Sequence, residues 1–244
     1  MTMRIRSAIF FLLLIPILSV SVIAQETPLK KNSRPTAEAK KTESDPKALV
    51  PVYFYEFEKP EFIVARIWIE HDEQGHGTVK FQKKDFDETF TDKLELSETT
   101  LQKLKELWGA VNFLDSSEKF QSDIRDYGHL GTIKLRMEKD GKQRTEEFNW
   151  TEIADVKLLA EEYRKIATQD VWMFDFDVAR QNQPLETPKL MKGLDSYLRR
   201  NAIADPVQML PFLKSLTDDE RVPLITRNHA ARLVKQIESK SESK

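Results

Sequence analysis

The sequence has 244 residues, with 38 basic and 40 acidic side chains and a formal net charge of −2. This mild acidic excess gives no reason to expect a nucleic-acid partner. The chain contains no cysteine, which excludes disulfides, thiolate metal sites and cysteine nucleophiles. An exported eukaryotic domain of this size would commonly carry disulfides, so the composition favours a bacterial protein.

Residues 1–24 have the three-part pattern of a signal peptide. Two arginines make a positive start, an apolar run follows from Ala8 to Leu18, and Ala24 has the small side chain expected before a cleavage site. The apolar run is shorter than the roughly 20 residues that a membrane span needs. No lipobox cysteine follows it. We therefore expect cleavage after Ala24, a periplasmic or secreted protein, and no stable membrane anchor; an uncleaved N-terminal anchor is the alternative.

Residues 25–48 are predicted to form a disordered linker. This stretch is polar, holds Pro28, Pro35 and Pro46, and has no aromatic residue. Such a composition buries too little apolar surface to offset the loss of chain entropy on folding. We interpret it as a solvated spacer between the export signal and the folded part of the chain.

An α+β domain is predicted over residues 49–170. Its strongest strand spans Phe62 to Glu70, where apolar residues alternate on both faces, which indicates an inner strand. An aromatic-rich strand precedes it at Val52–Phe57, and the glycines and acids of His71–Gly77 predict a turn into a returning strand. A further strand is expected between Asp85 and Thr91.

Two helices and a hairpin complete the predicted domain. The first helix begins after Ser97, a favoured N-cap residue, and apolar residues at three- and four-residue spacing give it one buried face. The pair Asp140-Gly141 predicts a type I′ hairpin, and Thr151 is expected to cap the second helix. This order of elements favours an antiparallel sheet with two helices on one face.

An α-helical C-terminal region is predicted over residues 171–240. It opens with Trp172–Asp177, an apolar segment without a clear period. Helix starts are expected at Thr187-Pro188 and Asp205-Pro206, because each is a capping residue followed by proline. The segment Thr217–Glu220 has the spacing of a capping box.

As a whole, this pattern resembles exported bacterial proteins of unknown function. The resemblance rests on Phe62–Trp150, with its strand pairs and the helix after Ser97, and it covers about half of the mature chain. It carries no catalytic motif. What it implies is a compartment rather than an activity.

The turn that follows the strongest strand is the first candidate site. His71, Asp72 and His76 offer imidazole and carboxylate groups, which bind zinc and similar divalent ions. The helical His-Glu-x-x-His arrangement, which fixes two imidazoles on one face, is missing. A polar hairpin tip also needs these residue types, and we favour that structural interpretation.

A second loop brings Asp123, Asp126 and His129 together in the sequence. An Asp–His pair can orient a general base, but loops rich in aspartate and glycine are usually only turns. No serine lies in a strand-turn-helix elbow, and the seven glycines form no phosphate-binding loop. The structural interpretation is again favoured.

Asp175 and Asp177 form the third candidate site. On a strand they would share a face, as paired carboxylates for a cation or a glycosidic bond require. The simpler interpretation is an ion pair with Arg180. Sheet aromatics could also line a ligand groove, although such residues more often belong to the core; these are Tyr53, Phe54, Tyr55, Phe57 and Trp68.

The leading functional hypothesis is an exported module that binds a protein partner or an envelope component. It rests on the export signal, the linker and the missing catalytic motif, and it includes no enzymatic activity and no cofactor. The alternative is a metal-dependent hydrolase centred on His71, Asp72 and His76. A structural envelope protein held by an uncleaved anchor is the third possibility.

Overall fold

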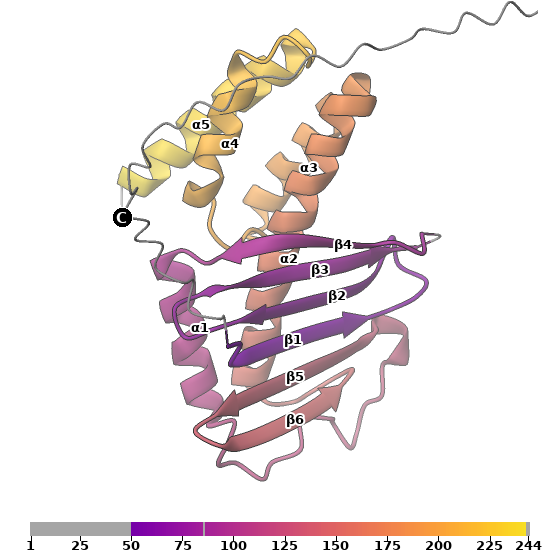
Figure 1. Ribbon diagram of the computed structural model, residues 1–244, viewed down its shortest axis with the longest axis vertical. Coiled ribbons are helices and arrows are strands. Elements are labelled where there is room, and N and C mark those ends of the chain that lie inside the picture. The colour runs from indigo at the N-terminus through magenta and orange to yellow at the C-terminus, as the bar shows by residue number, and fades with distance from the viewer. Residues whose placement is uncertain (1–49, 85, 243–244) are drawn as a thin grey trace, which may run out of the picture. The chain divides into compact units, whose positions relative to one another are not determined.

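The structure is a computed structural model that describes residues 50–84 and 86–242. The signal peptide and the linker predicted over residues 1–24 and 25–48 lie outside this part of the chain and stay predictions. The described residues form six strands and five α-helices (Figure 1): β1 Tyr53–Glu58, β2 Val64–His71, β3 His76–Lys83, β4 Thr89–Glu95, α1 Glu98–Val111, β5 Thr132–Lys139, β6 Lys142–Phe148, α2 Ala154–Asn182, α3 Thr187–Arg199, α4 Leu210–Thr217 and α5 Leu224–Glu242.

The six strands make one antiparallel sheet in the order β4-β3-β2-β1-β5-β6. β2 lies between β1 and β3, which confirms the predicted inner strand. Tyr53, at the start of β1, is opposite His71 and Met137. Glu58, at the other end of β1, is opposite Thr132. The sheet therefore has a Tyr53 end, which carries the β2–β3 turn, and a Glu58 end, which carries the β1–β2 connection.

Helices α1 and α2 cover the same face of the sheet. The ring of Tyr53 lies 5.5 Å from Trp108 of α1, and the ring of Tyr55 stacks on Tyr163 of α2 with centroids 5.1 Å apart. Tyr53 and Tyr55 point to one face because side chains alternate along a strand. Figure 1 shows α2 passing behind the strands. The predicted α+β fold, with two helices on one face and a helical C-terminal region, is confirmed.

Local signals place several element ends where the sequence predicts them. The side chain of Ser97 accepts a hydrogen bond from the Thr100 amide, so it is the N-cap of α1. Asp140 and Gly141 have φ values of 52° and 75°, the left-handed backbone that a type I′ turn requires. The fourth strand, expected between residues 85 and 91, begins at Thr89.

Helix α2 differs most from its prediction. It begins at Ala154, and Thr151 accepts a hydrogen bond from the Ile153 amide in the turn before it, so Thr151 is not the N-cap. The helix then continues for 29 residues, through the segment in which no helix was predicted. Trp172 and Phe176 are buried within it at four-residue spacing, because a second set of helices packs there.

Two clusters of buried apolar side chains meet on α2. The first cluster joins the sheet, α1 and the part of α2 up to Ala167. The second cluster begins at Trp172 and joins α2 to α3, α4 and α5. The domain boundary predicted at residue 170 thus lies between the two clusters but inside one helix. Because α2 is buried on different sides along its length, its apolar residues follow no single period around this boundary.

The C-terminal helices follow their predicted starts with small shifts. Asp205 accepts hydrogen bonds from the amides of Val207 and Gln208, and a single 3-10 turn then leads into α4. Thr187 is already the first residue of α3. The predicted capping box at Thr217–Glu220 does not form, because α5 begins only at Leu224. No helix within residues 50–242 is long and apolar enough to cross a membrane.

Candidate functional site

The structure does not bring His71, Asp72 and His76 together as a metal site. His71 is fully buried on the inner face of the sheet, whereas the side chain of His76 is 55% exposed. Asp72 accepts hydrogen bonds from the amides of Gln74 and His76, which is a turn-stabilising role. Among the residues described by the structure, no group of three or more His, Asp or Glu side chains could hold a metal ion.

His71 instead belongs to a buried chain of hydrogen bonds. Its Nδ1 lies 2.8 Å from the Asp72 carbonyl oxygen, which can only accept, so Nδ1 carries the proton. Its Nε2 must then accept from the Tyr163 hydroxyl at 2.9 Å, and that hydroxyl accepts from the Trp108 indole N–H at 2.9 Å. Burial lowers the pKa of His71. This chain of hydrogen bonds links α1 and α2 to the sheet, and every donor in it has an acceptor when the imidazole is neutral.

The second His/Asp loop lies at the opposite end of the sheet. Asp126 accepts from the amide of Gly128 and from the Asn149 side chain, so it also stabilises a turn. Lys59, just beyond β1 at the Glu58 end, donates to the Gly128 carbonyl. The turn that carries His71 is at the Tyr53 end, and the two loops therefore do not converge. Asp123 and His129 are exposed in this second loop.

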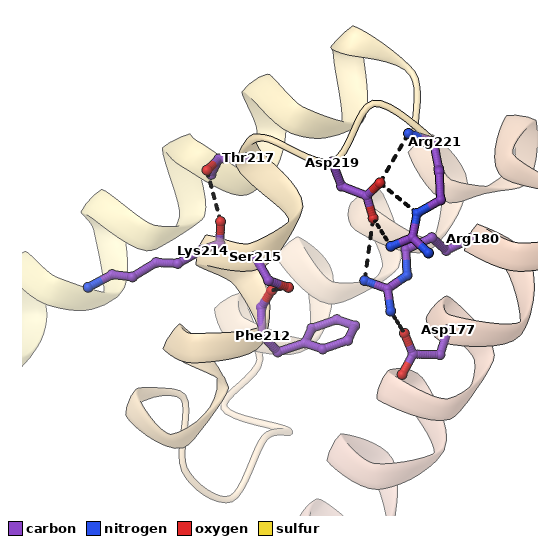
Figure 2. A network of polar contacts seen from close by, with 8 residues as sticks. All are labelled: Asp177, Arg180, Phe212, Lys214, Ser215, Thr217, Asp219 and Arg221. Atoms are coloured by element: carbon purple, nitrogen blue, oxygen red, sulfur yellow. Dashed lines mark hydrogen bonds and ion pairs between the residues drawn. The ribbon is translucent and has the colours of Figure 1, made fainter.

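Asp175 and Asp177 lie on α2, where residues two apart point in different directions. Asp175 forms an ion pair with Lys83 of β3. Asp177 pairs with Arg180 at 2.5 Å, as the structural interpretation predicted. Figure 2 shows that Arg180 also reaches Asp219, at 3.5 Å, in the loop between α4 and α5.

Asp219 is the centre of this polar network. Arg221 bonds to it through its amide and its guanidinium group (Figure 2). These hydrogen bonds lower the pKa of Asp219 to about 2. The guanidinium of Arg180 lies 5.9 Å from the ring of Phe212. The network fastens the α4–α5 loop to α2, which is a structural role.

The most prominent site is a large cavity between the sheet and the helices, called the groove below. Its volume is about 1110 Å³, and it is lined by β1, the β1–β2 connection, β2, the start of β5, the residues that end and follow β6, and one face each of α2 and α3. It lies at the Glu58 end of the sheet, on the side of α2 that faces away from α1. Aromatic and aliphatic side chains make most of its walls, among them Phe57, Ile133, Phe148, Trp150 and Leu190.

Small residues keep the groove open. Ala160 and Ala167 face it from α2, and Gly193 faces it from α3, so neither helix fills the space against the sheet. Gly131 has a φ of 92°, and a Cβ atom there would lie 2.6 Å from the Phe57 ring. Glycine is therefore required at residue 131 for Phe57 to occupy its place in the wall.

Large apolar side chains are exposed at the mouth of the groove. Phe62 and Ile63, in the β1–β2 connection, are 45% and 80% exposed, and Leu130 is 42% exposed. Apolar side chains exposed singly are ordinary on protein surfaces, whereas several beside an apolar cavity indicate a binding site.

A few polar groups interrupt the apolar walls. Tyr55 lines the groove and is only 2% exposed, yet its hydroxyl has no hydrogen bond to any residue between 50 and 242 that is described. Burial raises the pKa of Tyr55 to about 12, and the positive charge of Arg164 opposes that shift. Arg164 also lines the groove, and its guanidinium has no ion pair in the described part of the chain.

A second cavity of about 450 Å³ lies between β4, α2 and α4. Asp170 lines it, and one carboxylate oxygen of this residue is buried without a hydrogen-bond partner among the described residues. Burial, with a smaller contribution from Asp92, raises the pKa of Asp170 to about 7. A carboxyl group in this state is an acid that titrates near neutral pH.

Sequence reasoning found part of the groove. Tyr55 and Phe57 were among the aromatics considered as possible groove residues, whereas Phe54 and Trp68 point to the other face of the sheet. Arg164 and the small residues of the two helices were missed; the two alanines seven residues apart in α2, Ala160 and Ala167, were the available signal. No model of a known protein family matches the chain, and no curated protein sequence matches it either. The resemblance to exported bacterial proteins therefore stays a prediction.

Proposed function

We propose that this protein is an exported, non-enzymatic binding module of the cell envelope and that the groove is where it binds an apolar ligand. The observation that carries the proposal is the groove itself, with its volume of about 1110 Å³ and its mostly apolar walls. Ligand sites typically have volumes of about 300–1,000 Å³. A cavity slightly above this range favours a large or elongated molecule over a small metabolite.

The surroundings of the groove support binding rather than catalysis. The three groups of polar residues considered as catalytic or metal sites have structural hydrogen bonds or ion pairs, or are exposed in the loop that leads to Leu130. The exposed Phe62, Ile63 and Leu130 offer apolar area that a ligand would remove from water. Burial of such area contributes about 25 cal/mol per Å².

Two glycines provide a matched pair of variants for the binding test. Gly193 faces the groove from α3, and Gly109 lies in α1 outside it. A Cβ atom at either residue meets no atom within 4 Å, and neither has a positive φ. The first side-chain atom of a tryptophan therefore has room in both helices, but only Gly193 lines the groove.

The probe is Nile red, a neutral apolar dye whose fluorescence rises in an apolar environment. We expect saturable binding of one dye per wild-type molecule, unchanged binding to Gly109→Trp, and strongly weakened binding to Gly193→Trp. Circular dichroism and urea unfolding establish that both variants are folded. Equal dye binding by the two variants would show that the dye binds elsewhere and would contradict the assignment of the groove.

Export is tested separately, on the N-terminus. When the gene is expressed in a bacterial host, we expect the protein in the periplasm or the medium, with Gln25 as its first residue by mass spectrometry. Recovery of the full chain from the membrane fraction with Met1 in place would contradict cleavage. Recovery from the cytoplasm would contradict export.

A further inference from the structure

Tyr55 brings a hydroxyl without a protein partner to the groove. The residue as a whole is 2% exposed and lines the groove, and it bonds to no described residue. Its oxygen is not one of the fully buried polar atoms that lack a partner, so it stays accessible. The hydroxyl of Tyr163, which stacks on Tyr55, instead has two hydrogen bonds within the protein. The Tyr55 hydroxyl therefore marks the place in the groove where a ligand would present a hydrogen-bond acceptor.

Arg164, an exposed residue of α2, supplies a positive charge to the same groove. It directly follows Tyr163, whose ring stacks on Tyr55. No described carboxylate pairs with Arg164. A guanidinium group binds carboxylates through two parallel N–H donors. Together the two side chains offer donors and a positive charge and no acceptor other than the phenol oxygen, which is a set suited to an anion.

The other charges that line the groove leave this preference in place. Of the three carboxylates in its walls, Glu61 pairs with Lys59 at 2.9 Å and Asp175 pairs with Lys83. Only Glu161 lacks an ion pair within the part of the chain that the structure describes. Two lysines also line the walls: Lys157 pairs with Glu152 at 3.9 Å, and Lys189 has no ion pair with a described residue.

The walls favour an alkyl chain over a peptide for the remainder of the ligand. The backbone groups of β1 and β5 are paired in the sheet, and those of α2 are paired within the helix. A peptide that entered between them would leave its own amides and carbonyls without partners, which is unfavourable. An alkyl chain has no such groups, and the burial of each methylene favours binding.

We propose that the ligand of the groove is a free long-chain fatty acid, whose carboxylate accepts hydrogen bonds from the Tyr55 hydroxyl and the Arg164 guanidinium while its alkyl chain lies along the apolar walls. This inference rests on the proposed function, because it names the ligand class of the same groove. One carboxylate thus gives a partner both to the Tyr55 hydroxyl and to the Arg164 guanidinium, neither of which has one among the described residues.

The test compares two probes of equal chain length, dodecanoate and dodecanol, by competition with Nile red at neutral pH. Wild-type protein is expected to bind the carboxylate more tightly than the alcohol. Arg164→Met should weaken dodecanoate binding about tenfold to hundredfold, the range for a lost hydrogen bond to a charged group. Tyr55→Phe should weaken it about tenfold. Arg164→Met should weaken dodecanol binding much less than dodecanoate binding, since the alcohol carries no negative charge for the guanidinium to pair with.

Lys189→Met is the matched control variant, because it removes a cation from another wall of the same groove. It should weaken dodecanoate binding much less than Arg164→Met does. Equal losses in the two variants, with no effect of Tyr55→Phe, would show attraction by the general positive charge and would overturn the assigned pair. Binding to anionic phospholipid vesicles without binding to dodecanoate would overturn the free fatty acid.

The outcomes also separate this inference from the proposed function. If dodecanol and Nile red bind, and Gly193→Trp weakens both, the groove is a binding site whatever the head group. Equal affinity for dodecanoate and dodecanol would then overturn only the fatty-acid inference. If neither probe nor dye binds the wild-type protein, the proposed function itself fails.

Discussion

Two stacked tyrosines should respond very differently to the loss of a hydroxyl. The rings of Tyr55 and Tyr163 lie 5.1 Å apart and almost parallel, and both side chains are buried. The Tyr163 hydroxyl accepts from Trp108 and donates to His71, at 2.9 Å in each case. The Tyr55 hydroxyl has no described partner. Tyr163→Phe and Tyr55→Phe therefore make the same chemical change in adjacent rings with unequal consequences.

The expected difference follows from the groups left behind. Tyr163→Phe leaves the Trp108 indole N–H and the His71 Nε2 buried without partners, at about 1–3 kcal/mol each, so the free energy of unfolding should fall by about 2–6 kcal/mol. Rotation of His71 brings no relief, because its Nδ1 is held by the Asp72 carbonyl. Tyr55→Phe strands no group and should change stability by about 0.5 kcal/mol or less.

Urea unfolding followed by far-ultraviolet circular dichroism measures both variants. With a urea dependence of ~3 kcal/mol/M, the midpoint of Tyr163→Phe should fall by about 1–2 M, while that of Tyr55→Phe should not move measurably. Equal slopes are needed for the comparison, because a changed slope indicates a changed unfolded or folded state. Similar midpoint shifts in the two variants would refute the reasoning that the hydrogen-bonded chain, and not the ring packing, makes the difference.

Three further predictions concern charge and backbone. The pKa of Asp170 is raised from 3.8 to about 7 in the folded state, so the folded protein binds a proton that the unfolded chain releases. The free energy of unfolding should therefore decline as the pH rises from 3.8 to about 7. Asp170→Asn should make this decline smaller, as measured by the urea midpoint at each pH. The pKa of Asp219 is lowered to about 2 in the folded state. Its contribution to the free energy of unfolding should therefore be lost as the pH falls from 3.8 towards 2. Asp219→Asn should remove this dependence on acid from the urea midpoints. Gly131→Ala should lower the free energy of unfolding by about 1–3 kcal/mol, because the residue has a φ of 92° and the new Cβ would clash with Phe57. Gly141→Ala is the control: its φ is 75°, but no atom lies within 4 Å of the new Cβ, so it should lower the free energy of unfolding by less.

The sequence predicted those features that neighbouring residues determine. Ser97 caps α1 through a bond to an amide three residues on, and Asp140-Gly141 makes its turn through its own backbone preference. The antiparallel sheet follows from strand periods and short turns, which are also local. Such features need no knowledge of what packs against them.

Features that depend on distant contacts were not predictable in the same way. The continuation of α2 past residue 170 is stabilised by the second cluster, where Phe176 packs with Phe212 of α4 at 5.7 Å. His71 and His76 are close in sequence, but they lie on opposite faces of the sheet because His71 is opposite Gly77, and His76 is the next residue along the same strand. Tyr55 and Arg164 come from β1 and α2, and only the folded chain places them at the same groove.

Because α2 belongs to both apolar clusters, the walls of the groove come from both of them. One wall is the sheet, whose packing belongs to the first cluster, and another is α3, whose buried residues belong to the second. The Trp172 indole donates to the Leu190 carbonyl at 2.9 Å, and both residues line the groove, so this bond sets how close α3 lies to α2. The C-terminal helices are therefore part of the binding site. The ion pair between Arg180 and Asp219 also joins these helices to α2. A ligand in the groove should stabilise both clusters, because it contacts a wall from each.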